Sequence, residues 1–179
     1  MRFAVIGIDH RHIYHMIGGL IEAGAHCAGF VAATTDIKVL EGIAERFPQL
    51  RPVDDARVFL DDPAIDIILT AAVPRDRAAI AMAAMRAGKD VMSDKPGITD
   101  REQLAAVEEI ARETGRIFSI CFSERFVVPA TAIAERLLDE GAIGRVIQTI
   151  GLGPHRLNRP IRPAWFFETA AYGGILVDI

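Results

Sequence analysis

The sequence has little cysteine: only Cys27 and Cys121 occur among 179 residues. Both lie in apolar, strand-like runs, and two such cysteines cannot supply the disulfide framework of a small secreted domain. They are expected to be reduced thiols in the core of a cytoplasmic protein.

Long apolar runs and an excess of one charge are also missing. No run approaches the roughly 20 residues that span a bilayer, and the apolar opening at residues 3–6 is too short for a signal peptide. The net charge is −4 and the pI about 5.7, which does not indicate a nucleic-acid-binding surface. Because 51% of the residues are hydrophobic, a large core is expected, with neither a membrane nor a nucleic acid as partner.

Short apolar runs alternate with helical periodicity along the first two thirds of the chain. Strands are expected at residues 3–6, 27–33, 65–71, 90–93 and 116–122. Helices are expected at residues 13–23, 37–47, 78–87 and 100–114, with a weak turn at 56–60. This alternation predicts an α/β fold, a Rossmann-like doubly wound parallel sheet of about five or six strands with Gly7 at the carboxyl end of the first.

The pattern changes after Phe122. A helix is expected at residues 129–139, a strand at 145–152, and then a proline-punctuated loop. A lone strand leaves unpaired backbone groups, so dimerisation, aggregation or disorder is expected here. The residues expected to form an exposed apolar patch are Trp165, Phe166, Phe167, Ile175 and Leu176. The apolar end of the sequence, without a cap or polar tail, suggests an interrupted chain.

The turn after the first strand, Gly7-Ile8-Asp9-His10-Arg11-His12, is the candidate cofactor loop. A dinucleotide fingerprint has the pattern G-x-G-x-x-G/A here. Gly7 fits its first position, but Asp9 and His12 occupy the second and third. The start of the following helix favours an anion, Asp9 opposes one, and Arg11 offsets this in part. A cofactor loop and an ordinary strand-to-helix turn both stay open.

The second strand is followed by Thr34-Thr35-Asp36, where an acid would bind the adenosine ribose of NAD. Thr34 takes the position of that acid, and Asp36 comes two residues later. Neutral Thr34 and Thr35 beside Lys38 tolerate a 2′-phosphate better than an acid would. This favours NADP, or the absence of a tightly bound cofactor.

The fourth strand runs into Asp94-Lys95-Pro96, at the edge where a doubly wound sheet binds its ligand. Pro96 biases Lys95 away from the helical region, and Thr99 with Glu102 predicts a capping box for the next helix. Lys95 is therefore either a functional group at the crevice or a surface lysine in a turn.

Three histidines, His10, His12 and His15, cluster in the sequence with Asp9, which raises the possibility of a metal site. Solvated or crevice-lining histidines are the favoured interpretation, so no metal ligand is assigned. His155, in the proline-rich loop, is a candidate for contact with a substrate.

Taken in order, these segments resemble the Gfo/Idh/MocA family of NAD(P)-dependent oxidoreductases over essentially the whole chain. Asp94-Lys95-Pro96 is similar to the family's Glu-Lys-Pro motif, and residues 141–144 to its Gly-x-Ile-Gly turn. Arg125-Phe126 followed by Pro129 is similar to its Arg-Phe-x-Pro segment with one extra residue. Residues 172–178 resemble the start of its Gly-Gly-x-x-x-Asp-x-Gly-x-His motif.

The resemblance implies a dinucleotide-binding Rossmann domain at residues 1–122 and the incomplete beginning of a C-terminal substrate or oligomerisation domain at 123–179. It implies a cytoplasmic homo-oligomer that uses NAD or NADP to oxidise or reduce a sugar, cyclitol or related hydroxy or carbonyl compound. Lys95 and Asp178 are then catalytic, and Lys95, His155 and Trp165 contact the substrate. The cofactor-binding residues are then Gly7, Ile8, Asp9, His10, Arg11, His12, Thr34, Thr35, Ala72, Pro74, Asp94 and Lys95.

Three departures from the family pattern leave other functions open. Arg77 stands where the family usually has a histidine after Pro74, and the fingerprint lacks two glycines; both departures argue against tight cofactor binding. The family's proton-transfer histidine falls beyond Ile179. The 179-residue chain alone is therefore expected to have no measurable dehydrogenase turnover. The alternatives are a truncated or degenerate protein that binds a nucleotide without turnover, and a Rossmann module with a different small ligand.

Overall fold

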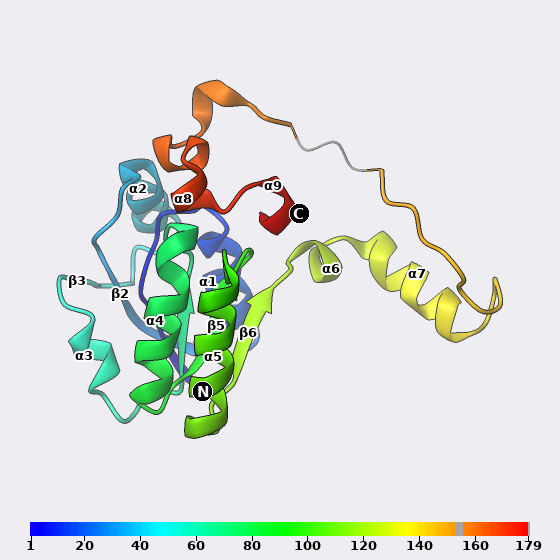
Figure 1. Ribbon diagram of the computed structural model, residues 1–179. Helices are drawn as coiled ribbons and strands as arrows, with labels where there is room; N and C mark the ends of the chain where they lie inside the picture. The colour runs from blue at the N-terminus through cyan, green and yellow to red at the C-terminus, as the bar shows by residue number, and fades with distance from the viewer. Residues whose placement is uncertain (153–155, 179) are drawn as a thin grey trace. The chain divides into compact units, whose positions relative to one another are not determined.

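The computed structural model describes residues 1–152 and 156–178 (Figure 1). The chain divides into two compact units. Unit 1 consists of Met1–Cys121 together with Pro163–Ile179, and unit 2 consists of Phe122–Arg162. The candidate site lies wholly within unit 1.

Unit 1 is built on a six-stranded sheet in the order β3-β2-β1-β4-β5-β6, and every pairing is parallel. The strands are β1 (Arg2–Val5), β2 (His26–Val31), β3 (Pro52–Val53), β4 (Ile67–Thr70), β5 (Asp90–Asp94) and β6 (Phe118–Cys121). This is the strand order of the doubly wound Rossmann fold, in which the ligand crevice opens where β1 and β4 diverge. The predicted fold class is confirmed, including the place of Gly7 after β1.

Helices cover both faces of this sheet (Figure 1). They are α1 (Ile13–Glu22), α2 (Ile37–Arg46), α3 (Arg57–Leu60), α4 (Pro74–Arg86) and α5 (Arg101–Thr114). Phe3 and Val5 of β1 pack with α1 and α2, whereas Ala4 and Ile6 pack with α4 and α5. Successive strand residues point to opposite faces, so the continuous apolar run of β1 supplies two separate cores.

Two helix starts differ from the prediction. Helix α4 begins at Pro74, four residues before the expected start, because proline is well suited to a first helical position. The cap of α5 is Asp100, whose side chain accepts a hydrogen bond from the Gln103 N–H, while Gln103 Oε1 accepts one from the Thr99 N–H. The capping box thus lies one residue later than predicted, because aspartate caps more strongly than threonine.

Unit 2 contains α6 (Glu124–Val127), α7 (Pro129–Asp139) and the 3-10 turn η1 (Arg159–Ile161). Helix α7 has the predicted bounds and no buried residue. The strand predicted at residues 145–152 is wrong: these residues are irregular and exposed. A single strand has no neighbour with which to form a ladder, so its apolar pattern alone does not make it a strand.

The end of the chain, from Pro163 on, packs within unit 1 as η2 (Ala164–Phe167), α8 (Thr169–Tyr172) and α9 (Ile175–Asp178). Trp165 and Tyr172 are buried with Val73 and Ala171, and Trp165 is only 8% exposed. The expectation that Trp165 is exposed is therefore wrong, because the start of α4 gives it an apolar surface. Among the other residues expected in the patch, Phe167, Ile175 and Leu176 are exposed.

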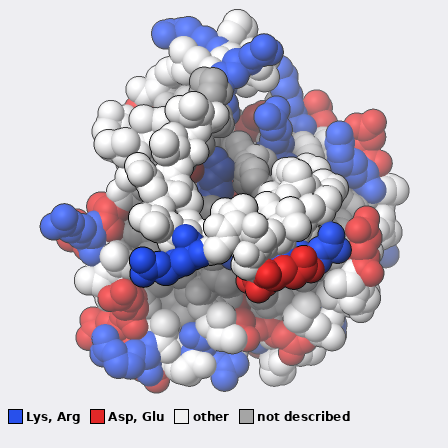
Figure 2. All heavy atoms as spheres, turned by 90° about the vertical axis from the view of Figure 1, so that its right-hand side faces the viewer, with Lys and Arg blue, Asp and Glu red and all other residues white. Residues whose placement is uncertain are grey.

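The remaining sequence expectations concern thiols, membranes and charge. Cys27 and Cys121 form no disulfide, and burial raises the pKa of the Cys27 thiol to about 11. Among the described helices, none has the length and apolar character of a membrane span. Figure 2 shows basic and acidic side chains interspersed on one face of the molecule, rather than a continuous surface of one sign.

Candidate functional site

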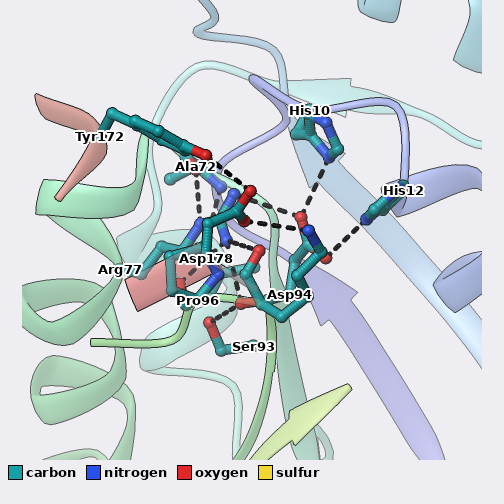
Figure 3. Close-up of polar contacts among 11 residues, drawn as sticks. His10, His12, Ala72, Arg77, Ser93, Asp94, Pro96, Tyr172 and Asp178 are labelled. Atoms are coloured by element: carbon teal, nitrogen blue, oxygen red, sulfur yellow. Dashed lines mark hydrogen bonds and ion pairs between the residues drawn. The ribbon is translucent and has the colours of Figure 1, made fainter. Parts of the chain in front are cut away.

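The candidate site lies at the carboxyl end of β5, where three other parts of unit 1 meet it (Figure 3). The β1–α1 turn contributes His10 and His12, α4 contributes Arg77, and α9 contributes Asp178. Their polar side chains converge on Asp94 and Lys95. The topology brings these residues together because the carboxyl ends of parallel strands share one edge of the sheet.

Asp94 is the centre of a buried hydrogen-bond network. Nδ1 of His12 and Nδ1 of His10 donate to its two carboxylate oxygens over 2.9 and 3.1 Å, and Nη2 of Arg77 donates over 3.2 Å. Burial by itself would raise the pKa of Asp94. The hydrogen bonds from His10 and His12 and the charge of Arg77 outweigh burial and hold that pKa well below its usual range. Asp94 is therefore a carboxylate that connects the candidate cofactor loop to β5.

The sequence identified Arg77 only as a replacement for a histidine, whereas the structure shows that its side chain binds the backbone around Lys95. Its side chain is 1% exposed, and burial lowers the pKa of its guanidinium. It donates to the carbonyl oxygens of Asp94, Lys95 and Pro96 over 2.9, 2.8 and 3.0 Å, and to that of Ala72 over 2.7 Å. Arg77 therefore fixes the backbone that carries Lys95. Its neighbours in the sequence, Arg75 and Asp76, gave no signal that distinguishes Arg77 from an exposed arginine.

Lys95 and Asp178 form an ion pair although 83 positions separate them in the sequence. Lys95 Nζ donates to Asp178 Oδ1 over 2.9 Å, and the Tyr172 hydroxyl donates to Asp178 Oδ2 over 2.7 Å. Both charged side chains are nearly buried, with 10% and 7% of their surface exposed. The structure thus brings the two residues predicted as catalytic into direct contact. It adds Tyr172, which lay in the quoted motif but was assigned no role.

Gly7 allows β1 and β4 to approach closely at the switch point. Its φ is +91°, and an added Cβ would lie 2.5 Å from Ala72 Cβ and 2.9 Å from Thr70 Oγ1. In the described residues, no backbone carbonyl accepts from the N–H groups of residues 9–12, so these donors remain available at the start of α1. A glycine cradle beside open N–H groups fits a dinucleotide pyrophosphate.

Other predicted loop residues have different surroundings. Ile8 is fully buried in the core formed with α1 and α2, so only its backbone faces the turn. Arg11 is exposed, and Pro74 is buried at the start of α4. Trp165 lies edge-on to His10, with ring centroids 6.4 Å apart, and its buried Nε1 finds no hydrogen-bond acceptor among the residues that the structure describes. His155 lies outside the described residues.

Asp9 is turned towards the end of β2. Its Oδ1 accepts hydrogen bonds from Thr34 Oγ1 over 3.1 Å and Thr35 Oγ1 over 2.7 Å, and a further bond from the Thr35 N–H. The three loop residues Asp9, Thr34 and Thr35 are therefore in contact with one another. The sequence argument considered Asp9 as an opponent of the pyrophosphate, as a neighbour of the histidines and as a cofactor-binding residue, but it did not place Asp9 beside the threonines.

The histidine cluster also differs from the one considered in the sequence. His10 and His12 converge with Asp94, and their potential ligand atoms lie within 4.8 Å of one another. Asp9 is engaged by the threonines instead. The guanidinium of Arg77 already occupies one oxygen of Asp94, and a cation there disfavours a second cation beside it. We assign no metal to these residues.

The sheet order and glycine turn define a Rossmann-type α/β protein, and comparisons with known proteins identify its family. The Gfo/Idh/MocA oxidoreductase family, with an NAD-binding Rossmann fold, matches residues 1–122. Levoglucosan dehydrogenase from Pseudarthrobacter phenanthrenivorans is 31% identical and is aligned over 92% of this chain and 47% of its own length. This chain belongs to the Gfo/Idh/MocA family, which confirms the resemblance.

Solved structures are also similar to the chain, among them the following two. A presumed oxidoreductase from Erwinia carotovora atroseptica is 44% identical, with a TM-score of 0.93 over 99% of this chain and 53% of that one. The WlbA dehydrogenase from Bordetella pertussis, crystallised with NADH and UDP-GlcNAcA, is 20% identical, with a TM-score of 0.65 over 80% of this chain and 43% of that one. The second similarity concerns the fold alone. The chain spans about half the length of these relatives.

Proposed function

We propose that this protein is an NAD(P)-dependent dehydrogenase for a sugar, a cyclitol or a related hydroxy or carbonyl compound. The observation that carries the proposal is the Lys95–Asp178 ion pair at the sheet edge that also holds the Gly7 turn. The proposal is supported by the names of three relatives, levoglucosan dehydrogenase, D-xylose dehydrogenase and inositol 2-dehydrogenase 2. It keeps residues 1–122 as the dinucleotide-binding domain and residues 123–179 as the beginning of a second domain.

In this proposal, NAD or NADP lies over residues 7–12, and its nicotinamide accepts or donates the hydride when bound. The open N–H groups at the start of α1 bind the pyrophosphate. Ala72 and Pro74 line the crevice after β4, and Thr34 and Thr35 lie at the end of β2, on the adenosine side. Asp94 holds His10 and His12 in place, so the turn is organised before a ligand arrives.

Lys95 is the residue that we assign to the substrate oxygen. Its ammonium has three N–H donors, and one of them is directed to Asp178. The Tyr172 hydroxyl fixes the other carboxylate oxygen, so the position of Nζ is defined. A remaining N–H donates to the substrate oxygen, which polarises a carbonyl or holds a hydroxyl. Trp165 and His155 are proposed as further substrate contacts.

The test measures turnover and cofactor binding separately. The protein as its gene encodes it is assayed for NADH or NADPH formation with a panel of sugars and polyols, and NADH binding is followed by fluorescence titration. We expect Lys95→Met to lower kcat by about 100-fold or more and to change the Kd of NADH less than about threefold. Equal activity of wild type and Lys95→Met would refute the assigned role.

A second candidate function is binding of a nucleotide without turnover. The observation that favours it is the presence of Asp9 and His12 at the second and third positions of the fingerprint, where small residues normally allow the closest approach. NADH binding with no turnover across the substrate panel would support this function. Turnover that depends on Lys95 would exclude it.

We further propose that the protein is a cytoplasmic homo-oligomer. The absence of a disulfide between Cys27 and Cys121 is consistent with the cytoplasm. Exposed large apolar residues are numerous in unit 2, as expected for an interface. Those exposed by more than half are Phe122, Val127, Ile133, Ile143, Ile147, Ile150, Leu152, Leu157 and Ile161. Light scattering should show self-association at micromolar concentration, and a stable monomer would contradict this assignment.

A further inference from the structure

We infer that Asp9 selects NAD over NADP, because its carboxylate supplies at the end of β2 the negative charge that β2 itself lacks. This inference rests on the proposed dinucleotide site. In many Rossmann proteins the acid that binds the adenosine ribose comes from the end of β2. Here that position is Thr34, and the carboxylate next to it comes from the β1–α1 turn.

The position of the Asp9 carboxylate is fixed by its contacts. Oδ1 accepts from both threonine hydroxyls and from the Thr35 N–H, and the residue is 8% exposed. These neutral donors leave its negative charge in place. No ion pair joins Asp9 to a cation among the residues that the structure describes. A buried, unneutralised carboxylate is screened by salt much less than a surface charge.

The neighbouring cations do not cancel the negative charge of Asp9. Arg77 interacts electrostatically with Asp9, but its guanidinium is already paired with the Asp94 carboxylate. Asp36 caps α2 through its contact with the Lys38 N–H and adds a second negative charge near the same loop. The Arg11 and Lys38 side chains are exposed, and water and salt weaken their attraction for a phosphate. An uncharged ribose 2′-hydroxyl can donate a hydrogen bond to a carboxylate, whereas a 2′-phosphate offers only negative charge and acceptors.

The sequence argument favoured NADP because it considered only the residues that follow β2. The threonines there are neutral, but in the structure both hydroxyls donate to Asp9. Spacing along the chain does not reveal this contact, since 25 positions separate Asp9 from Thr34.

The experiment compares NADH and NADPH binding to the full chain by fluorescence titration. We expect wild type to bind NADH at least about tenfold more tightly than NADPH. Asp9→Asn keeps an acceptor oxygen for the threonines and removes the charge, so it should reduce this ratio at least about fivefold by tightening NADPH. The comparison variant is Asp36→Asn, which removes a carboxylate that is less buried than Asp9 but keeps a good helix cap, so it should lower the ratio less than about twofold.

Three results would overturn the inference. If wild type binds NADPH as tightly as NADH, Asp9 is not selective, although the proposed function stands. If Asp9→Asn weakens both dinucleotides equally, Asp9 only shapes the loop. If neither dinucleotide binds wild type, the proposed function fails as well. A second measurement needs no variant: AMP, which differs from 2′,5′-ADP only by the 2′-phosphate, should compete for the site at least about tenfold better than 2′,5′-ADP, and equal competition overturns the inference.

Discussion

Arg77→Met is expected to destabilise the protein strongly, because it removes the charge and donors of a buried guanidinium but keeps an unbranched side chain of similar length. In the wild type, Arg77 makes five hydrogen bonds, one to the Asp94 carboxylate and four to carbonyl oxygens. The variant leaves the carboxylate with His10 and His12 alone and leaves the carbonyls of β5 and the following loop without this donor.

The size of the loss follows from the burial of both charges. Arg77 and Asp94 have side chains that are 1% and 2% exposed. Breaking one side of such a buried pair costs about 3–5 kcal/mol. The matched control is Arg75→Met, in the same turn of α4, because Arg75 is 51% exposed and faces Asp76 at 3.5 Å. An exposed ion pair of this kind contributes less than about 1 kcal/mol.

Urea and thermal unfolding followed by circular dichroism would measure both variants. For a chain of this length, the loss corresponds to a fall in Tm of roughly 6–20 °C for Arg77→Met, and of no more than about 4 °C for Arg75→Met. If the two variants unfolded within about 1 kcal/mol of each other, the Arg77 network would not stabilise the site as argued.

Two further predictions concern the cofactor loop. Gly7→Ala should lower the free energy of unfolding by about 2–4 kcal/mol, because its Cβ would meet Ala72 and its φ is positive. The control Gly24→Ala has a similar φ but nothing within 4 Å of the added Cβ, so it should cost only about 1 kcal/mol. Equal losses of the two variants in urea unfolding would contradict the close approach of Gly7 to Ala72. Burial lowers the pKa of His10 despite its bond to Asp94. As the pH falls, the unfolded chain therefore takes up the proton on this histidine before the folded chain does. The stability that neutral His10 contributes is present above about pH 6.5 and is lost as the pH falls below that value. In His10→Asn, the free energy of unfolding should therefore fall less between about pH 7.5 and 5.5 than it does in the wild type. A larger fall in the variant would show that the folded state raises the pKa of His10 instead of lowering it.

The strands were predictable where several of their residues are buried on both faces. The run from Phe3 to Ile6 serves two cores at once, and a continuous apolar run is what such a strand requires. The two residues of β3, Pro52–Val53, are too few to show any period. Residues 145–152 have the composition of a strand, but strand formation also depends on a pairing partner, which local sequence does not encode.

The residues of the site were easier to predict than their contacts. The motifs predicted roles for Lys95 and Asp178, which stay predictions, but they did not indicate the bond between the two side chains, which joins segments 83 positions apart. The roles of Arg77 and Tyr172 depend on which way each side chain points from its helix, and a lone arginine or tyrosine in a sequence does not specify this. Asp9 was placed correctly in the turn after β1, but its bonds to Thr34 and Thr35 could not be inferred from spacing.

The contacts of Asp94 and Arg77 connect the proposed cofactor turn to the proposed catalytic lysine. Asp94 accepts from His10 and His12 of the turn, and it also accepts from Arg77. Arg77 in turn holds the carbonyl oxygen of Lys95. Since each of these groups is held by at least one charged partner, moving the turn would strain the bonds that position the lysine backbone. When a dinucleotide binds to the turn, we therefore expect Lys95 to be already in position. Hydride transfer requires this kind of preorganisation, because the substrate must be held in the correct orientation.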